Sequence, residues 1–172
     1  RLSAEIPPCI LGCAGYAIGA RVEVAETEAF QALLFDSGIQ ENADSLSFPL
    51  DLALRPRKRY YWRVTVWGNT GDVATSDVAW FETGKQDEQW QAQWFSPPFD
   101  KEIHPVMCHS FSLRGKVRQA RAYVCGLGLY ELYINGQKAG DEVLTPFCND
   151  YDTWIQYQTI DITALLKKQN QL

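Results

Sequence analysis

The sequence predicts an all-β protein made of two sandwich modules, and three features of the chain lead to this fold class. Apolar and polar side chains alternate along many short segments, whereas the spacing of an amphipathic helix is scarce. Turn signals rich in Gly, Pro, Asn and Asp separate these segments at short intervals. Aromatic residues, which favour strands, make up 13% of the 172 residues.

The clearest strand in the chain covers residues 60–67 and reads Tyr-Tyr-Trp-Arg-Val-Thr-Val-Trp. Its side chains alternate between two faces, as expected for a strand with one face in a core. A turn over residues 68–72 and a returning strand over Val78–Thr83 complete a predicted hairpin. Four earlier strands are expected, at Leu2–Ile6, Tyr16–Ala25, Leu33–Asp36 and Ser45–Leu50.

A more specific pattern, Leu54-x-Pro56-x-Lys58-x-Tyr60, precedes this strand. It resembles the Leu-x-Pro-x-Thr-x-Tyr signature of fibronectin type III modules, with Lys58 where Thr is usual. In such corners the Tyr hydroxyl bonds back to upstream backbone. We therefore expect Tyr60 to be buried, with its hydroxyl bonded to the backbone of residues 54–57. The first module is predicted to be a fibronectin III/immunoglobulin-like β-sandwich over residues 1–84.

The second module is predicted over residues 94–172, after a polar linker at 85–93. The Asn135-Gly136 pair predicts a tight hairpin turn, and Thr163 is expected to be the N-cap of a short helical turn. Strands are expected at Ser110–Leu113, Arg118–Cys125, Leu129–Ile134, Gln137–Val143 and Trp154–Ile160. A jelly roll has about eight strands. The module is therefore interpreted as part of a jelly-roll β-sandwich.

Charge and hydropathy exclude several classes of partner. The net charge is −5 and the pI is about 5.0, whereas a nucleic-acid binder would carry a basic surface. The short basic cluster of Arg55, Arg57, Lys58 and Arg59 is interpreted as a solvated strand edge. No apolar run approaches the length that spans a bilayer. The chain shows no signal peptide and begins with Arg1 rather than Met, so we expect a piece of a longer protein.

The cysteines do not indicate a metal site. His104, Cys108 and His109 lie close together, but zinc sites usually add a second ligand pair and none follows. We therefore expect no metal and no other cofactor, and we expect the cysteines to be buried free thiols. The five cysteines do not define the redox compartment; they are Cys9, Cys13, Cys108, Cys125 and Cys148.

An ordered series of short motifs gives the chain its strongest resemblance. The series resembles the N-terminal region of bacterial α-L-rhamnosidases, family 78 of the glycoside hydrolases, from about Leu33 onward. The motifs are Phe35-Asp36-Ser37-Gly38, Tyr61-Trp62-Arg63-Val64-x-Val66-Trp67, Trp80-Phe81-Glu82-Thr83-Gly84, Trp90-x-x-x-Trp94, Gly126-Leu127-Gly128-x-Tyr130-Glu131-Leu132-Tyr133-Ile134-Asn135-Gly136, Asp150-Tyr151-Asp152 and Gln156-Tyr157-Gln158-Thr159-x-Asp161-Ile162-Thr163.

The resemblance implies a non-catalytic accessory region. In that family a fibronectin-like module leads into a jelly roll, and a later helical (α/α)₆ barrel hydrolyses terminal α-L-rhamnosyl residues with inversion. No segment of this chain resembles the barrel, so we expect no catalytic residue here. The implied partner is the rest of the parent enzyme. A periplasmic or extracellular location is expected over a cytoplasmic one.

The residues themselves also argue against catalysis. Inverting glycosidases hold two carboxyl groups about 6.5–9.5 Å apart around the sugar. The acidic residues of the second module show no spacing that places a pair on one rigid element. Gly126-x-Gly128 leads into a strand rather than a helix, so a dinucleotide site is not expected.

An alternative function is a free-standing carbohydrate-binding or adhesive module. Sugar sites combine aromatic faces with fixed polar groups, and one loop cluster offers both: Asp150, Tyr151, Asp152 and Trp154. In this interpretation the ligands are rhamnosyl glycans. The competing interpretation is that Tyr151 and Trp154 cap the core of the sandwich.

The low strand count of the second module leads to an expectation about association. An incomplete sandwich leaves an open apolar face and strand edges that can pair with another chain. We therefore expect either a homodimer through the second module or partial disorder after about Cys108.

Overall fold

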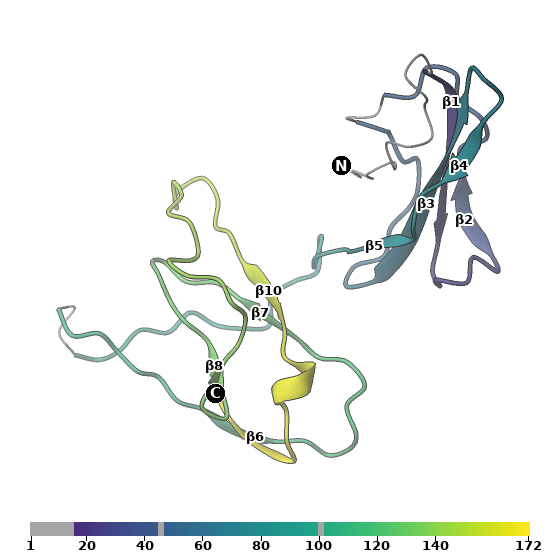
Figure 1. Cartoon of the computed structure of the whole chain (residues 1–172). Coiled ribbons are helices and arrows are strands. Elements are labelled where there is room, and N and C mark those ends of the chain that lie inside the picture. Colours follow the sequence, from purple (N-terminus) through teal and green to yellow (C-terminus); the bar gives the residue numbers. More distant parts are fainter. Residues whose placement is uncertain (1–15, 45–46, 100–101) are drawn as a thin grey trace. The chain divides into compact units, whose positions relative to one another are not determined.

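The computed structural model describes residues 16–44, 47–99 and 102–172 of the chain. These residues fall into two compact units, Arg1–Gln91 and Ala92–Leu172, which are treated separately here (Figure 1). The strand expected at Leu2–Ile6 lies outside the described residues. The linker over 85–93 stays a prediction.

Unit 1 is built around one antiparallel sheet. Its strand order is β2-β1-β3-β4, and β5 also pairs with β3, as Figure 1 shows. The strands are β1 (Ala17–Ala25), β2 (Leu33–Asp36), β3 (Arg59–Gly68), β4 (Val73–Thr75) and β5 (Ala79–Glu82). The strands predicted at residues 16–25, 33–36 and 60–67 are therefore confirmed. The prediction for Ser45–Leu50 is wrong over its described residues, which form no strand.

The physical reason for this error lies in how the 47–54 segment packs. Phe48, Leu50, Leu52 and Leu54 alternate with other residues and are partly buried against the core of unit 1. Their alternation therefore reflects contact with the core, and not the pairing of a strand in the sheet.

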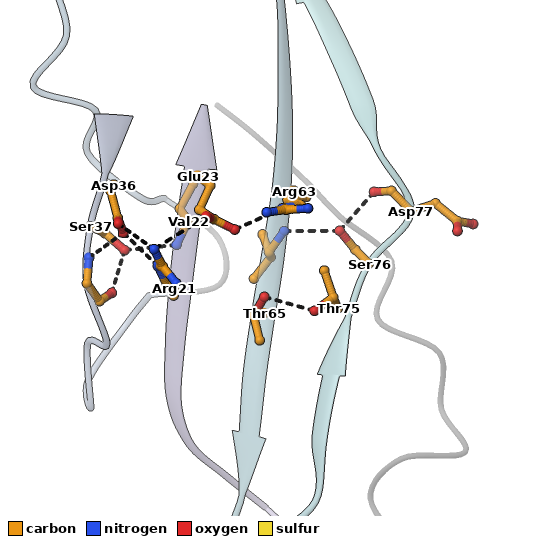
Figure 2. A network of polar contacts seen from close by, with 12 residues as sticks. Arg21, Val22, Glu23, Asp36, Ser37, Arg63, Thr65, Thr75, Ser76 and Asp77 are labelled. Atoms are coloured by element: carbon orange, nitrogen blue, oxygen red, sulfur yellow. Dashed lines mark hydrogen bonds and ion pairs between the residues drawn. The ribbon is translucent and has the colours of Figure 1, made fainter. Parts of the chain in front are cut away.

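The chain that returns after β3 is divided into two strands instead of the single one predicted. β4 pairs with Thr65–Trp67 and β5 pairs with Arg59–Trp62. Between them, the Ser76 backbone N–H donates to the Val64 carbonyl at 2.8 Å, and the Ser76 hydroxyl accepts from the Val64 N–H at 3.0 Å (Figure 2). A serine side chain thus replaces a ladder bond at the break.

The core of unit 1 is formed by Val22, Val24, Tyr60 and Trp62, which are all buried. Tyr60 is only 1% exposed, and its hydroxyl accepts a 2.8 Å hydrogen bond from the Arg55 backbone N–H. The predicted corner is confirmed in both its burial and its bond. This bond holds the segment before β3 against the sheet. Arg55 lies outside every strand, so no strand pairing holds it there.

The face of the sheet opposite the core carries a charged network. Glu23 is only 5% exposed and lies between two guanidinium groups, with Arg63 Nε at 2.8 Å and Arg21 at 3.4 Å. Arg21 also binds the carboxylate of Asp36, and the Arg63 guanidinium lies 4.5 Å from the centre of the Phe30 ring. Figure 2 shows Arg21, Glu23, Asp36 and Arg63 in a row across β2, β1 and β3. Each charge in the network has a partner within it, so the network ties three strands together.

Unit 2 contains three two-stranded antiparallel sheets. β6 (Ser110–Ser112) pairs with β11 (Gln169–Gln171), β7 (Arg121–Val124) with β10 (Gln158–Asp161), and β8 (Tyr133–Ile134) with β9 (Gln137–Lys138). Each of the five predicted strands of this module is present, and each is shorter than expected. β11 was not predicted, because Gln-Asn-Gln has no apolar alternation.

The Asn135-Gly136 hairpin is confirmed, and both residues have the positive φ, 53° and 78°, that a type I′ turn requires. The Asn135 side-chain amide donates to the Leu165 carbonyl at 2.8 Å and to Asn170 Oδ1 at 3.0 Å. Asn170 is buried, and its own amide donates to the Lys167 carbonyl at 2.8 Å. The core beside this amide pair consists of Ile134, Ala139 and Ile162.

The N-cap predicted at Thr163 is wrong. The single turn of 3₁₀-helix runs from Thr163 to Leu165, so Thr163 is its first residue and Ile162 precedes it. The Thr163 hydroxyl accepts instead from the Ala120 N–H at 2.9 Å, while Asp161 Oδ1 accepts from the Thr163 N–H at 2.9 Å. The Thr163 hydroxyl is therefore bound by the Ala120 backbone, which is distant in sequence, and does not cap the 3₁₀ turn.

The prediction that the cysteines are buried is also wrong for two of those described. Cys108 and Cys148 are exposed and Cys125 is half-buried, and all three are free thiols. Cys108 and Cys148 lie in loops, where a small apolar side chain has no core to enter. In the described part of the chain, no helix is long and apolar enough to cross a bilayer.

Replacing Tyr60 with Phe tests the corner bond of unit 1. The substitution keeps the buried ring and removes the hydroxyl that accepts from Arg55, so unfolding should cost about 0.5–1.5 kcal/mol less free energy. Urea unfolding followed by tryptophan fluorescence measures this change. Tyr16→Phe, at a side chain that is 63% exposed, is the control and should change nothing. Equal midpoints for Tyr60→Phe and the unsubstituted chain would contradict the role of the bond.

The charged network predicts an acid-dependent stability. The hydrogen bond from Arg21, aided by the Gly38 N–H, lowers the pKa of Asp36 from 3.8 to about 2. Stability from this group is therefore fully present above pH 3.8 and is lost as the pH falls toward 2. Asp36→Asn should flatten the dependence of the urea midpoint on pH in this window. An unchanged acid profile in the variant would contradict the assignment.

Candidate functional site

The predicted sugar-binding cluster lies on the segment between β9 and β10, in a turn over residues 151–153. The Asp150 carboxylate accepts from the Thr153 hydroxyl at 2.8 Å and from the Asp152 N–H at 3.3 Å. The Asp150 carbonyl accepts from the N–H groups of Thr153 and Trp154 at 2.9 and 3.0 Å. Asp150 therefore uses its acceptors to build its own turn, as Asp commonly does.

The other three residues of the cluster divide between the interior and the surface. Tyr151 is half-buried, and its phenol lies beside the Cys148 thiol and the Gly128 backbone; burial is the main cause that raises the pKa of Tyr151. Asp152 is exposed, and Trp154 is 52% exposed. The structure thus brings all four residues into one turn, in which Asp150, Asp152 and Trp154 are exposed and Tyr151 is half-buried.

Two segments of unit 2, residues 126–130 and 141–157, are joined near this turn. The Tyr130 N–H donates to the Thr145 carbonyl at 3.1 Å, and the Gln158 amide donates to the Thr145 hydroxyl at 3.1 Å and to Glu142. The Tyr130 hydroxyl donates to the Val124 carbonyl at 2.9 Å, and burial raises the pKa of Tyr130 to about 12. We call the region formed by residues 126–130 and 141–157 the loop end of unit 2.

Sequence reasoning missed the main property of the loop end, which is its exposed apolar side chains. Two of them, Leu144 and Phe147, are 78% and 73% exposed. The full set, called the loop patch from here on, is Leu127, Leu129, Val143, Leu144, Phe147, Trp154 and Ile155. The adjacent apolar pair Val143-Leu144, followed by Thr-Pro, was the available signal. The alternation predicts a strand that ends at Val143, whereas β9 ends at Lys138.

Three carboxylates of unit 2 are bound by neighbouring groups. Glu142 accepts from Gln158, Asp161 pairs with Arg121 at 2.8 Å, and Asp150 holds its own turn. Within residues 16–44, 47–99 and 102–172, no group of three His, Cys, Asp or Glu side chains is placed to hold a metal ion. These three carboxylates therefore bind neighbouring side chains or the turn of Asp150 itself.

A shallow groove of about 440 Å³ lies over the β6–β11 pair. Its lining is neutral: Ser110, Phe111, Ser112, Asn135, Gln169, Asn170 and Gln171. The two Asn amides are committed to bonds within unit 2. The groove therefore contains no titratable group that could act as an acid or a base.

Two family models match the chain in order. A Rha78A-like, N-terminal immunoglobulin domain matches residues 17–87, and an α-L-rhamnosidase N-terminal domain matches residues 115–172. This chain belongs to the N-terminal region of the α-L-rhamnosidase family. The resemblance seen in the sequence is thereby confirmed, and unit 1 is an immunoglobulin-like domain of that region.

Known proteins that are similar to this chain are named α-L-rhamnosidases. An α-L-rhamnosidase of Formosa agariphila is 32% identical over 66% of this chain and 15% of its own length. The solved α-L-rhamnosidase of Dictyoglumus thermophilum has a TM-score of 0.78 at 28% identity, covering 91% of this chain and 20% of that one. That of Aspergillus terreus has a TM-score of 0.73 at 28% identity, with 91% and 19% covered. This chain thus spans no more than 20% of each of these relatives.

Alanine substitutions should show that Asp150 stabilises the turn and that Asp152 does not. Asp150→Ala removes an acceptor of two hydrogen bonds and should lower the free energy of unfolding by about 0.5–1.5 kcal/mol. Asp152→Ala removes an exposed side chain and should change it by less than about 0.5 kcal/mol. Urea unfolding measures both variants. Equal losses would contradict the division of roles.

Proposed function

We propose that this chain is a non-catalytic accessory region of an α-L-rhamnosidase that hydrolyses terminal α-L-rhamnosyl residues from glycosides or polysaccharides. One observation carries the proposal: two N-terminal domain models of this family match the chain in succession, over residues 17–87 and 115–172. The relatives that share this region are themselves named α-L-rhamnosidases.

The geometry of unit 2 supports the non-catalytic part of the proposal. Inversion needs an acid and a base about 6.5–9.5 Å apart with room for a sugar and a water between them. The carboxylates of Glu142, Asp150 and Asp161 instead bind neighbouring side chains. Catalysis would then be the task of the helical barrel implied by the resemblance, and that barrel is the proposed partner. A periplasmic or extracellular location goes with this proposal.

A second candidate function, binding of rhamnosyl glycans, is favoured by the exposed indole of Trp154 and the exposed carboxylate of Asp152, which lie in the same turn region. An aromatic face and a charged acceptor are the groups that a sugar ring needs. Titration of L-rhamnose into the chain by calorimetry tests this candidate. Trp154→Ala should abolish the heat of binding if the site is real, whereas Trp80→Ala, at an indole that is 55% exposed on unit 1, should not.

The accessory role predicts a clear result for activity. This chain alone should not hydrolyse an aryl α-L-rhamnoside above the buffer rate, while the product of the full reading frame should do so. The reading frame should therefore encode several hundred further residues. Turnover by this chain that Asp152→Asn or Glu142→Gln abolishes would contradict the proposal, and so would a reading frame that ends at Leu172.

Association of two copies through unit 2 is the competing proposal for the partner. The short two-stranded sheets of this unit leave strand edges on which a second chain can pair. Light scattering at increasing protein concentration distinguishes a homodimer from a monomer.

A further inference from the structure

The loop patch concentrates apolar surface at one end of unit 2. Phe147 is 73% and Trp154 is 52% exposed, so these two aromatics alone present on the order of 200 Å² of surface. Leu144, Val143, Leu127 and Leu129 add aliphatic side chains that are each more than half exposed. Contiguous patches beyond a few hundred Å² are uncommon on monomeric soluble proteins and mark interaction surfaces.

One backbone hydrogen bond and one side-chain contact link the segments that carry the patch. The Tyr130–Thr145 backbone bond of 3.1 Å joins residues 126–130 to residues 141–148. The Tyr151 phenol, beside Cys148 and the Gly128 backbone, brings in the turn that precedes Trp154. Figure 1 shows the chain between β9 and β10 extending beyond the strands of unit 2. The patch is therefore a single surface made by adjoining loops.

The chemistry of the patch fits a protein better than a sugar. A saccharide needs hydrogen-bonding partners, but most members of the patch are aliphatic and offer none. Leu144 also has a φ of +54°, a strained conformation for a branched residue, and it points an apolar side chain to solvent. Contact with an apolar protein face would remove the exposed surface.

The charge around the loop patch indicates which kind of protein surface would bind it. Residues 126–130 and 141–157 contain four acidic and no basic residues; the acidic ones are Asp141, Glu142, Asp150 and Asp152. All four are exposed. Two copies meeting through this surface would bring like charges together, which is unfavourable. The complementary face is apolar at its centre and basic at its rim.

We infer that the loop patch is the surface by which this region docks onto an apolar, basic-rimmed face elsewhere in the same rhamnosidase polypeptide. The inference rests on the proposed function. The same polypeptide can supply such a face, because at least 80% of each compared relative lies outside the region that this chain covers. The acidic rim argues against a second copy, and the aliphatic centre argues against a glycan.

Hydrogen exchange in the 172-residue chain and in the product of the full reading frame tests the inference. Amides within residues 141–157 should exchange at least tenfold more slowly in the longer protein. The double variant Leu144→Asp with Phe147→Asp should abolish this difference, because it places charge at the centre of the patch. Val106→Asp, at a side chain of unit 2 that is 89% exposed and outside the patch, is the matched control and should preserve it.

Three results would overturn the inference. Equal exchange of residues 141–157 in both proteins, in a longer product that hydrolyses rhamnosides, would refute the docking surface and leave the proposed function intact. Protection in the 172-residue chain that rises with its own concentration would assign the patch to a second copy. Protection of that chain by added L-rhamnose would assign it to a sugar. A reading frame that ends at Leu172 would refute the proposed function, and the docking surface with it.

Discussion

The amide pair of Asn135 and Asn170 is the interaction on which unit 2 depends. The three sheets of this unit have two strands each, and isolated two-stranded sheets are marginally stable in water. Asn135 lies in the β8–β9 hairpin and Asn170 lies in β11, so their 3.0 Å bond joins two of these sheets. The bond from Asn135 to the Leu165 carbonyl adds the 3₁₀ turn. Three polar atoms, Asn135 Nδ2, Asn170 Oδ1 and the Leu165 carbonyl oxygen, thus connect segments that no ladder connects, next to a small core.

Unit 1 is held by a similar device, with a hydroxyl in place of an amide. The Tyr60 hydroxyl reaches the Arg55 N–H, and the Thr83 hydroxyl donates to the Arg55 carbonyl at 2.6 Å and accepts from the Lys58 N–H at 3.0 Å. The corner signature usually has Thr at the position of Lys58, and here Thr83 supplies a hydroxyl to the corner instead. In both units, side-chain bonds to backbone fix the irregular segments, while apolar burial fixes the strands.

This division explains what the sequence could and could not predict. Alternation located β1, β2 and β3, and the corner signature located the Tyr60 bond, because both depend on local patterns. β11 was missed because its pairing depends on a buried Asn170 rather than on apolar residues. In the candidate site, Asp150 and Trp154 were correctly placed in one loop. That Asp150 closes its own turn could not be predicted from the sequence, since this depends on the conformation that the turn adopts.

The break at Ser76 has a consequence for solubility. A long, straight, unpaired strand at the edge of a sheet invites another chain to pair and start an aggregate. On the side of β3 away from β1, the sheet ends in β4 and β5, which have only three and four residues. The Ser76 hydroxyl accepts the Val64 N–H at the gap between them. An incoming strand would therefore find two short, offset edges instead of one continuous template, so a single serine helps to keep unit 1 from assembling edge to edge.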